Sequence, residues 1–257
     1  MRGGANLKKK DLNRKNGTKS ARPKRNAVIP PSSAMMIFPT WADTTAKGRK
    51  TRQLILRAAL SILVDEGYRA MSLRRVATKC KIRFGNVTYY YPTREELVSE
   101  LLDSVLRGYE AGYEAISDGR DLCPEDRLVR LCRYTAEEIR SKQTTRLFPE
   151  LWALSNHDKF VFERMHALYR RGIVPMRKVV EELRPDLSQD VCTALSLFIC
   201  VSIEVLMVFA GFRKPFEPWI AAFESIASRC FVDLVKNVTA KEVGKLVPYD
   251  HLWFNLS

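Results

Sequence analysis

The chain has 257 residues, of which 46% are hydrophobic, and its formal net charge is +14. This hydrophobic share excludes a mostly disordered chain, and only 12 glycines and 12 prolines exclude a fibrous or low-complexity one. Residues 1–25 carry ten Lys or Arg against one acid, residues 47–98 carry twelve against four, and residues 99–257 are close to neutral. The positive charge therefore indicates a front end that binds a polyanion, followed by an ordinary globular body.

The first 46 residues are basic and rich in Asn, Gly, Ser and Pro, and their apolar side chains follow no period. We therefore expect residues 1–46 to form a disordered arm. Its apolar segments are too short for a secretory signal. Met35 and Met36 are alternative translation starts. If translation begins there, the positive charge of residues 1–34 does not contribute to polyanion binding.

Three helices are predicted between residues 51 and 90. The first begins near Thr51, has one apolar face and ends at Gly67. The second spans residues 73–79. The third spans residues 84–90, because the residue before Pro92 avoids the helical region. A longer helix followed by two short ones with a tight break is typical of a helix-turn-helix DNA-binding domain.

The third helix and its flanks carry the candidate DNA-binding residues. Val87 can face the domain core, which leaves the side chains around it for the major groove, where each base pair presents a distinct pattern. Arg and Asn suit guanine and adenine, Phe and Thr suit the thymine methyl, and other basic or tyrosine side chains hold phosphates. The candidates are Arg74, Arg83, Phe84, Gly85, Asn86, Thr88, Tyr89, Tyr90 and Arg94. The alternative is that the basic residues are only solvated and the tyrosines belong to the core.

The rest of the chain has helical periodicity and no alternating strand pattern, so the predicted fold class is all-α. The expected helices cover residues 94–117, 124–142, 148–156, 159–183, 188–212 and 219–238. One stretch of 22 residues, Val191 to Phe212, has a single charged residue, Glu204, and is long enough to span a bilayer. Its scattered Ser and Thr residues and the lack of a second such stretch favour the alternative, a helix buried in a core or a subunit interface.

The chain offers little material for catalysis or metal binding. Its six cysteines form no Cys-x-x-Cys pair, its three histidines form no zinc-ligand spacing with them, and no phosphate-loop or hydrolase motif occurs. We therefore expect no catalytic residues, no metal and no cofactor, and a protein of the reducing cytoplasm. A thiol-based redox switch is the open alternative.

Residues 47–100 follow a long, gapless pattern of small, apolar and aromatic positions. Its parts are Ile55-Leu56-x-Ala58-Ala59 with Glu66-Gly67, Ser72 with Val76-Ala77, and Gly85-Asn86-Val87-x-x-Tyr90-Tyr91-Pro92 before Arg94-Glu95-Glu96-Leu97. This pattern resembles the DNA-binding domain of TetR-family (TetR/AcrR) regulators, and residues 148–154 also resemble members of that family. Lys81 stands where the family usually has a turn glycine and Arg83 where it usually has a serine cap, so the operator sequence does not carry over.

The resemblance implies four segments: a basic arm (1–46), a helix-turn-helix DNA-binding domain (47–98), a helical effector-binding and dimerisation domain (99–240) and a tail (241–257). It also implies a homodimer formed through Leu187–Phe212 and Trp219–Val238, which accounts for the apolar helix without a membrane. The dimer is expected to bind a palindromic double-stranded DNA operator as a repressor and to be released by a small-molecule effector. An activator and a non-specific nucleic-acid-binding helical protein are the alternatives.

The resemblance places the effector among the middle helices. The candidates are Tyr134, Phe148, Trp152, Asn156, His166, Tyr169 and Glu204. For each aromatic residue, ordinary core packing is the competing interpretation. Glu204 stands apart, because a carboxylate in an apolar helix is costly unless it is paired. It is expected either to hold a cationic ligand or to pair with an arginine across the dimer.

Overall fold

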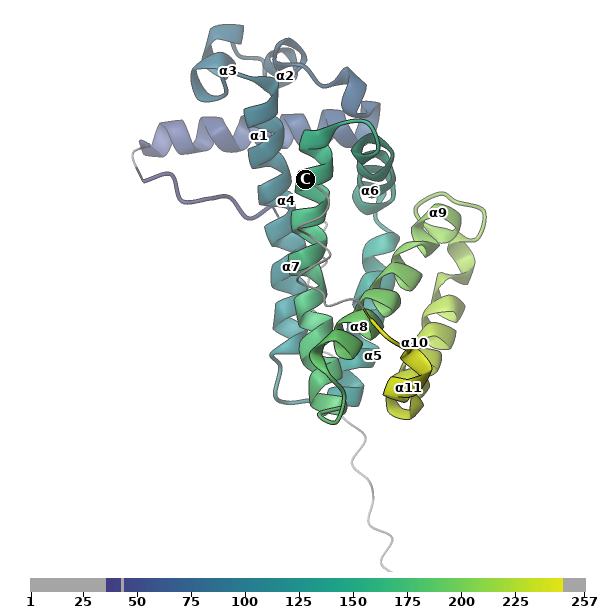
Figure 1. The fold of residues 1–257 in the computed structure, drawn as a ribbon. Coiled ribbons are helices and arrows are strands. Elements are labelled where there is room, and N and C mark those ends of the chain that lie inside the picture. The colour runs from purple at the N-terminus through teal and green to yellow at the C-terminus, as the bar shows by residue number, and fades with distance from the viewer. Residues whose placement is uncertain (1–35, 43, 247–257) are drawn as a thin grey trace, which may run out of the picture.

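The computed structural model describes residues 36–42 and 44–246, so most of the expected arm and the end of the tail lie outside the described residues. Figure 1 shows a small head of α1, α2 and α3 at one end of a larger helical body, with the long helix α4 running from the head into the body. All regular structure in the described ranges is helical, which confirms the predicted fold class.

The head contains three helices and one short turn of 3₁₀ helix. They are α1 (Ala46–Glu66), η2 (Tyr68–Ala70), α2 (Leu73–Cys80) and α3 (Phe84–Tyr90). The first helix begins five residues before the predicted Thr51, because the Thr45 side chain caps it by accepting a hydrogen bond from the Gly48 amide at 3.1 Å. It ends as predicted at Gly67, whose φ of 84° suits glycine. The other two helices match their predicted bounds to within one residue.

The body contains eight further elements. They are α4 (Arg94–Ser117), α5 (Pro124–Ile139), α6 (Lys142–Ser155), α7 (Lys159–Leu183), α8 (Gln189–Glu204), α9 (Leu206–Ala210), η3 (Glu217–Trp219) and α10 (Ile220–Asn237), followed by α11 (Ala240–Val243) at the start of the expected tail. Helix α6 begins six residues before the predicted Phe148, because the Ser141 side chain accepts a hydrogen bond from the Thr144 amide at 3.0 Å. The same cap separates α6 from α5, which ends at Ile139 instead of residue 142.

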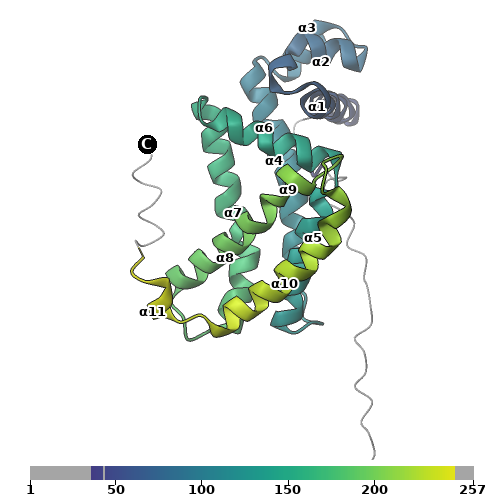
Figure 2. The same cartoon turned by 90° about the vertical axis from the view of Figure 1, so that its right-hand side faces the viewer.

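Helices α4, α5 and α7 pack on one another, and α8 and α10 lie against them. Figure 2 shows α8, α9 and α10 together on the face of the body that is turned toward the viewer. The head rests on the body through contacts of α1 with both α4 and α6. Two helices therefore connect the head to the interior of the body.

The predicted apolar helix of residues 188–212 is interrupted. Helix α8 ends at Glu204, and the short α9 (Leu206–Ala210) follows after Val205. The Phe212 amide then donates a hydrogen bond to Thr145 Oγ1 at 2.8 Å, and a Cβ on Gly211 would lie 2.5 Å from the same oxygen. The close approach of Gly211 to α6 thus requires a residue without a Cβ. By length and composition alone Gln189–Ala210 could cross a membrane, but 44% of its most apolar window is already buried inside the subunit.

Residues 36–41, at the end of the expected arm, pack on α4. The Ile37 amide donates to the Ser104 carbonyl oxygen at 2.9 Å, and Trp41 Nε1 donates to Glu100 Oε1 at 2.8 Å. The Trp41 ring is buried. Over this stretch the chain is therefore part of the folded domain, in contrast to the disordered arm expected up to residue 46. The packing of this stretch was not predicted, because its apolar residues are interrupted by proline and threonine and follow no period.

Candidate DNA-binding surface and interior cavity

The candidate DNA-binding residues of α3 lie on the outside of the head. Val87 is completely buried and fixes the helix to the domain core, as expected, whereas Tyr89 is 80% exposed. The remaining candidates on and around this helix are exposed or half-buried: Arg74, Arg83, Phe84, Gly85, Asn86, Thr88 and Tyr90. The Arg74 guanidinium lies 5.4 Å from the centre of the Phe84 ring, which joins α2 and α3 into one basic and aromatic surface.

The turn between α2 and α3 carries two unusual residues. Lys81 has φ 56° and ψ 39°, the left-handed conformation that a glycine adopts more easily, so the backbone does tolerate a side chain there. Arg83 occupies the N-cap position of α3 without a side-chain hydrogen bond to the helix. Its guanidinium is therefore exposed next to the surface of α3 and is not used as a cap.

Arg94 differs from the other DNA-binding candidates, because its side chain points toward η2. Arg94 Nη2 donates to the Tyr68 carbonyl oxygen at 2.8 Å, and the guanidinium lies 4.1 Å from the centre of the Tyr68 ring. The Tyr68 amide donates to Glu150 Oε1 on α6 at 2.6 Å. Tyr68 is thus held from α4 and from α6, which makes η2 the joint between the head and the body. Arg94 therefore has a structural role at this joint, and the phosphate contact expected for it stays a prediction.

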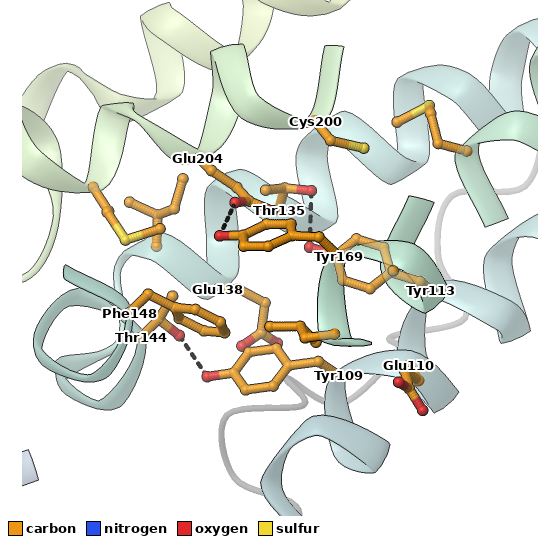
Figure 3. Close-up of a pocket in the computed structure, with 15 residues that line it drawn as sticks. Tyr109, Glu110, Tyr113, Thr135, Glu138, Thr144, Phe148, Tyr169, Cys200 and Glu204 are labelled. Carbon is orange, nitrogen blue, oxygen red and sulfur yellow. Dashed lines mark hydrogen bonds between the residues drawn. The ribbon is translucent and has the colours of Figure 1, made fainter. Parts of the chain in front are cut away.

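A cavity of about 70 Å³ lies inside the body, between α4, α5, α6, α7 and the end of α8 (Figure 3). Its walls are mostly aromatic and acidic side chains. The lining residues are Tyr109, Glu110, Tyr113, Thr135, Glu138, Ile139, Thr144, Phe148, Leu168, Tyr169, Gly172, Met176, Cys200, Glu204 and Met207.

A chain of two hydrogen bonds ends at Glu204 inside this cavity. Trp152 Nε1 donates to the Tyr169 hydroxyl oxygen at 2.5 Å, and the Tyr169 hydroxyl donates to Glu204 Oε2 at 3.0 Å. Figure 3 shows the Glu204 side chain directed toward the Tyr169 hydroxyl inside the cavity. Burial raises the pKa of the Glu204 carboxyl group to about 7, and the hydrogen bond from Tyr169 opposes part of that rise.

Two tyrosine hydroxyl groups of the wall are bound to threonines. The hydroxyl groups of Tyr109 and Thr144 lie 2.8 Å apart, and those of Tyr113 and Thr135 lie 3.1 Å apart. Burial raises the pKa of both tyrosines well above its ordinary value, so both phenols are neutral at physiological pH. The wall is therefore polar at a few fixed points and apolar elsewhere, as ligand cavities commonly are.

The comparison with known proteins identifies the head first. Residues 55–101 match the family model of bacterial regulatory proteins of the tetR family. Over 150 residues the chain is 25% identical to an HTH-type transcriptional regulator in the dhlA 5′ region of Xanthobacter autotrophicus. The matched stretch covers 57% of this chain and 72% of that relative. This chain is a TetR-family transcriptional regulator.

Solved structures with the same fold extend this likeness to the body of the regulator. A TetR-family regulator from Mesorhizobium loti matches with a TM-score of 0.61 at 15% identity, covering 74% of this chain and 98% of that one. A regulator from Saccharomonospora viridis, solved in complex with choline, matches with a TM-score of 0.58 at 14% identity, covering 74% and 97%. As a DNA-binding transcription factor of this family, the regulator is not an enzyme.

The cavity of the regulator contains some of the predicted effector residues and not others. Phe148, Tyr169 and Glu204 line it. Trp152 stands one step behind, bound to Tyr169, and Tyr134 packs against Gly112, where an added Cβ would lie 1.9 Å from its hydroxyl oxygen. Trp152 and Tyr134 therefore lie behind the cavity wall and do not line the cavity itself.

The last two predicted effector residues, Asn156 and His166, lie away from the cavity. Asn156 follows the last residue of α6 and is exposed to solvent. The His166 ring packs against Phe162 in a tilted arrangement, with the ring centroids 4.0 Å apart. Sequence reasoning missed Tyr109 and Tyr113, because their positions in α4 follow the same apolar period as ordinary core residues.

The regulator leaves an apolar face of α8, α9 and α10 uncovered. The exposed large side chains on and between these helices are Leu197, Phe198, Val201, Val205, Val208, Phe209, Phe216, Trp219 and Ile226. The predicted dimer segments, Leu187–Phe212 and Trp219–Val238, contain all of them except Phe216. Large apolar side chains exposed together on neighbouring helices indicate a contact surface.

Four of the six cysteines of the regulator are buried or half-buried, whereas Cys123 and Cys230 are exposed. Burial raises the pKa of the thiols of Cys80, Cys132, Cys192 and Cys200, which lowers their reactivity. Across the described ranges, no group of three or more His, Cys, Asp or Glu side chains is arranged to hold a metal ion.

Proposed function

We propose that the regulator is a homodimeric repressor in the cytoplasm, which binds a palindromic operator and leaves it when a small molecule occupies the cavity. The observation that carries this proposal is the connection between the two sites. Tyr109 and Tyr113 line the cavity from α4, and α4 continues to the head, where Arg94 holds Tyr68. A ligand that moves these tyrosines therefore acts on the helix that positions the DNA-binding surface.

Helix α6 offers a second connection. Phe148 lines the cavity, and Glu150, two residues further on, binds the Tyr68 amide in the head. Lys142 at the start of α6 also forms an ion pair with Asp65 in α1. A shift of α6 on ligand binding would change the position of the head relative to the body. The ligand needs only a different affinity for the two positions to shift the equilibrium.

The apolar face of α8, α9 and α10 supports the homodimer. Covering it with the same face of a second subunit removes exposed side chains such as Phe198 and Ile226 from water, and a twofold axis requires only one self-complementary surface. A twofold dimer would present two α3 helices to a palindromic operator, whose half-sites lie about 34 Å apart along the duplex. It also covers the apolar helix that could otherwise be assigned to a membrane.

The cavity supports ligand control. Its mixture of apolar rings with a few oriented polar groups is typical of small-molecule sites. The Saccharomonospora viridis regulator of the same fold was solved in complex with choline, so this fold accommodates a small organic ligand. We therefore assign the cavity, and not the exposed Asn156 or the half-buried His166, to the effector.

Selection of bound fragments from random DNA, followed by fluorescence anisotropy, tests the proposal. We expect one palindromic sequence bound at least about 1,000-fold more tightly than random duplex, with an affinity that falls as salt rises. Equal affinity for both duplexes would support the non-specific nucleic-acid-binding alternative. A transcription assay on the selected operator distinguishes a repressor from an activator by the sign of the change.

A further inference from the structure

We infer that the cavity binds a compact organic cation, such as a quaternary ammonium or a protonated amine, between the Glu204 carboxylate and the surrounding aromatic rings. This inference names the chemical class of the effector, so it rests on the proposed function, although the binding is measurable without DNA. Three properties of the wall carry it: its charge, its rings and its size.

The wall carries negative but no positive side chains. Three of its fifteen residues are acidic, namely Glu110, Glu138 and Glu204, and none of the fifteen is Lys, Arg or His. Glu110 is neutralised from outside the wall by Arg171, whose Nε lies 2.7 Å from Oε1. The hydrogen bond that Glu204 accepts comes from a neutral phenol. A cation in the cavity supplies a counter-charge to Glu204, whereas an anion would be repelled.

Four aromatic rings surround the same space: Tyr109, Tyr113, Phe148 and Tyr169 (Figure 3). The face of an aromatic ring attracts a cation, and the attraction is strongest where water is excluded. The Tyr109 and Phe148 rings meet edge to face with centroids 5.3 Å apart, so they present differently oriented surfaces to one ligand. Since the hydroxyl groups of Tyr109 and Tyr113 already bind threonines, the wall favours charge over hydrogen bonding as the basis of recognition.

The size of the cavity requires a compact ligand. A volume of about 70 Å³ is enough for several water molecules and is smaller than cavities that accept an aromatic ring, so a quaternary ammonium of the size of choline must push the wall outward as it binds. The wall has one open point at Gly172 on α7, where an added Cβ would meet no atom within 4 Å. A larger side chain at this position is therefore expected to extend into the cavity without displacing the backbone.

The experiment compares probes that differ in charge and share their shape. Choline, its neutral isostere 3,3-dimethylbutan-1-ol and the anion 3,3-dimethylbutanoate are titrated into the full chain without DNA, by calorimetry and by thermal shift. We expect choline to bind at least about tenfold more tightly than the neutral alcohol. We expect no measurable binding of the anion.

Two variants locate the effect. Glu204→Gln keeps the shape of the side chain and removes its charge, so we expect choline affinity to fall to that of the neutral alcohol, whose own affinity stays unchanged. Gly172→Leu fills the cavity and is expected to abolish binding of both. Gly172→Ala is the matched control, because it changes the same helical position and leaves the cavity open. Thermal unfolding of each variant confirms that it is folded.

The inference is overturned if the neutral alcohol or the anion binds as tightly as choline, if no probe binds, or if Glu204→Gln retains the preference for the cation. Operator anisotropy separates this result from the proposed function. Choline binding that depends on Glu204 but leaves the operator complex intact contradicts release by this ligand and supports the inference. Release of the operator by ligands without a preference for positive charge supports the proposed function and overturns the inference.

Discussion

The head and the cavity hold their candidate functional side chains in opposite environments. On α3, Asn86 and Tyr89 stand exposed to solvent, while the buried Val87 behind them holds the helix in place. In the body, Glu204 and Tyr169 meet inside the protein, where burial raises the pKa of the carboxyl group to about 7. The head therefore keeps binding groups separate from packing groups, whereas the cavity uses the same residues for both.

This difference has a direct consequence for variants. We expect a change on the exposed surface of α3 to weaken DNA binding and to leave the free energy of unfolding nearly unchanged. A change at Glu204 alters ligand binding and stability together, because the carboxylate is desolvated in the free protein. The predictions below test this contrast, beginning with the largest expected effect.

The first prediction concerns the apolar face of α8, α9 and α10. This face belongs to the body, but in one subunit it is exposed like the surface of the head. We expect Phe198→Glu combined with Ile226→Glu, placed on side chains that are 54% and 61% exposed, to give a monomer. Operator affinity should fall by at least about 100-fold, because a monomer loses the gain from two linked contacts. Ultracentrifugation and anisotropy measure both effects.

The conservative change Ile226→Val is the control for the dimer face and should leave a dimer with unchanged affinity. A charged double variant that remains dimeric would place the subunit interface elsewhere on the molecule.

The next largest effect is expected on the head. Asn86→Ala should weaken operator binding by about 1–3 kcal/mol, the usual contribution of a paired amide–adenine contact, and relax the preference at one base pair. Because the side chain is exposed, the midpoint of thermal unfolding should stay within about one degree of wild type. Asn156→Ala, a change of an exposed asparagine in the body, is the matched control and should leave affinity unchanged. Equal losses at both positions would mean that Asn86 makes no contact with DNA.

Local signals predicted the head well. The cap at Ser72, the break before Phe84 and the end at Tyr90 depend on neighbouring residues, so the sequence alone indicates them. The cavity depends on distant pairs: Tyr109 with Thr144, and Tyr169 with Glu204. No local period distinguishes these residues from ordinary core. Glu204 was an exception, because a single carboxylate in an apolar helix is conspicuous by its cost.

The same argument explains why the contact between Arg94 and Tyr68 was not predicted. The position of Arg94 beside the basic surface of the head suggested a phosphate contact, and nothing nearby in the sequence indicates that Tyr68 lies against it. The contact joins residues 26 positions apart and forms only once α4 packs beside η2.

The third prediction concerns stability and pH. The pKa of Glu204 is about 7 in the folded protein against an ordinary value of 4.5, so between these pH values the folded state holds a proton that the unfolded state has released. The contribution of Glu204 to the free energy of unfolding therefore falls as the pH rises from about 4.5 to about 7, and it stays at the lower value above pH 7. Glu204→Gln removes this loss and should be the more stable protein at pH 8, by at most about 3 kcal/mol, with little difference at pH 4.5.

Urea unfolding at pH 4.5 and pH 8 measures the difference. The other titratable groups that line the cavity near Glu204 are Glu138 from α5, Tyr113, Tyr169 and Cys200, and burial keeps the last three neutral across this range. Glu163→Gln, a change of an exposed carboxylate on α7, is the control and should follow wild type at both pH values. Parallel pH profiles for wild type and Glu204→Gln would show that the carboxylate is solvated.

The smallest expected effect lies at the joint between the two regions. Glu150→Ala removes the acceptor of the Tyr68 amide and should destabilise the protein by about 1 kcal/mol. Its informative result is the ratio of operator affinities with and without effector, which should fall about threefold or more if α6 transmits the signal from Phe148 to the head. Glu150→Gln keeps an acceptor oxygen and should preserve most of the ratio. An unchanged ratio in Glu150→Ala, at the same loss of stability, would assign the transmission to α4 alone and leave Glu150 a purely structural contact.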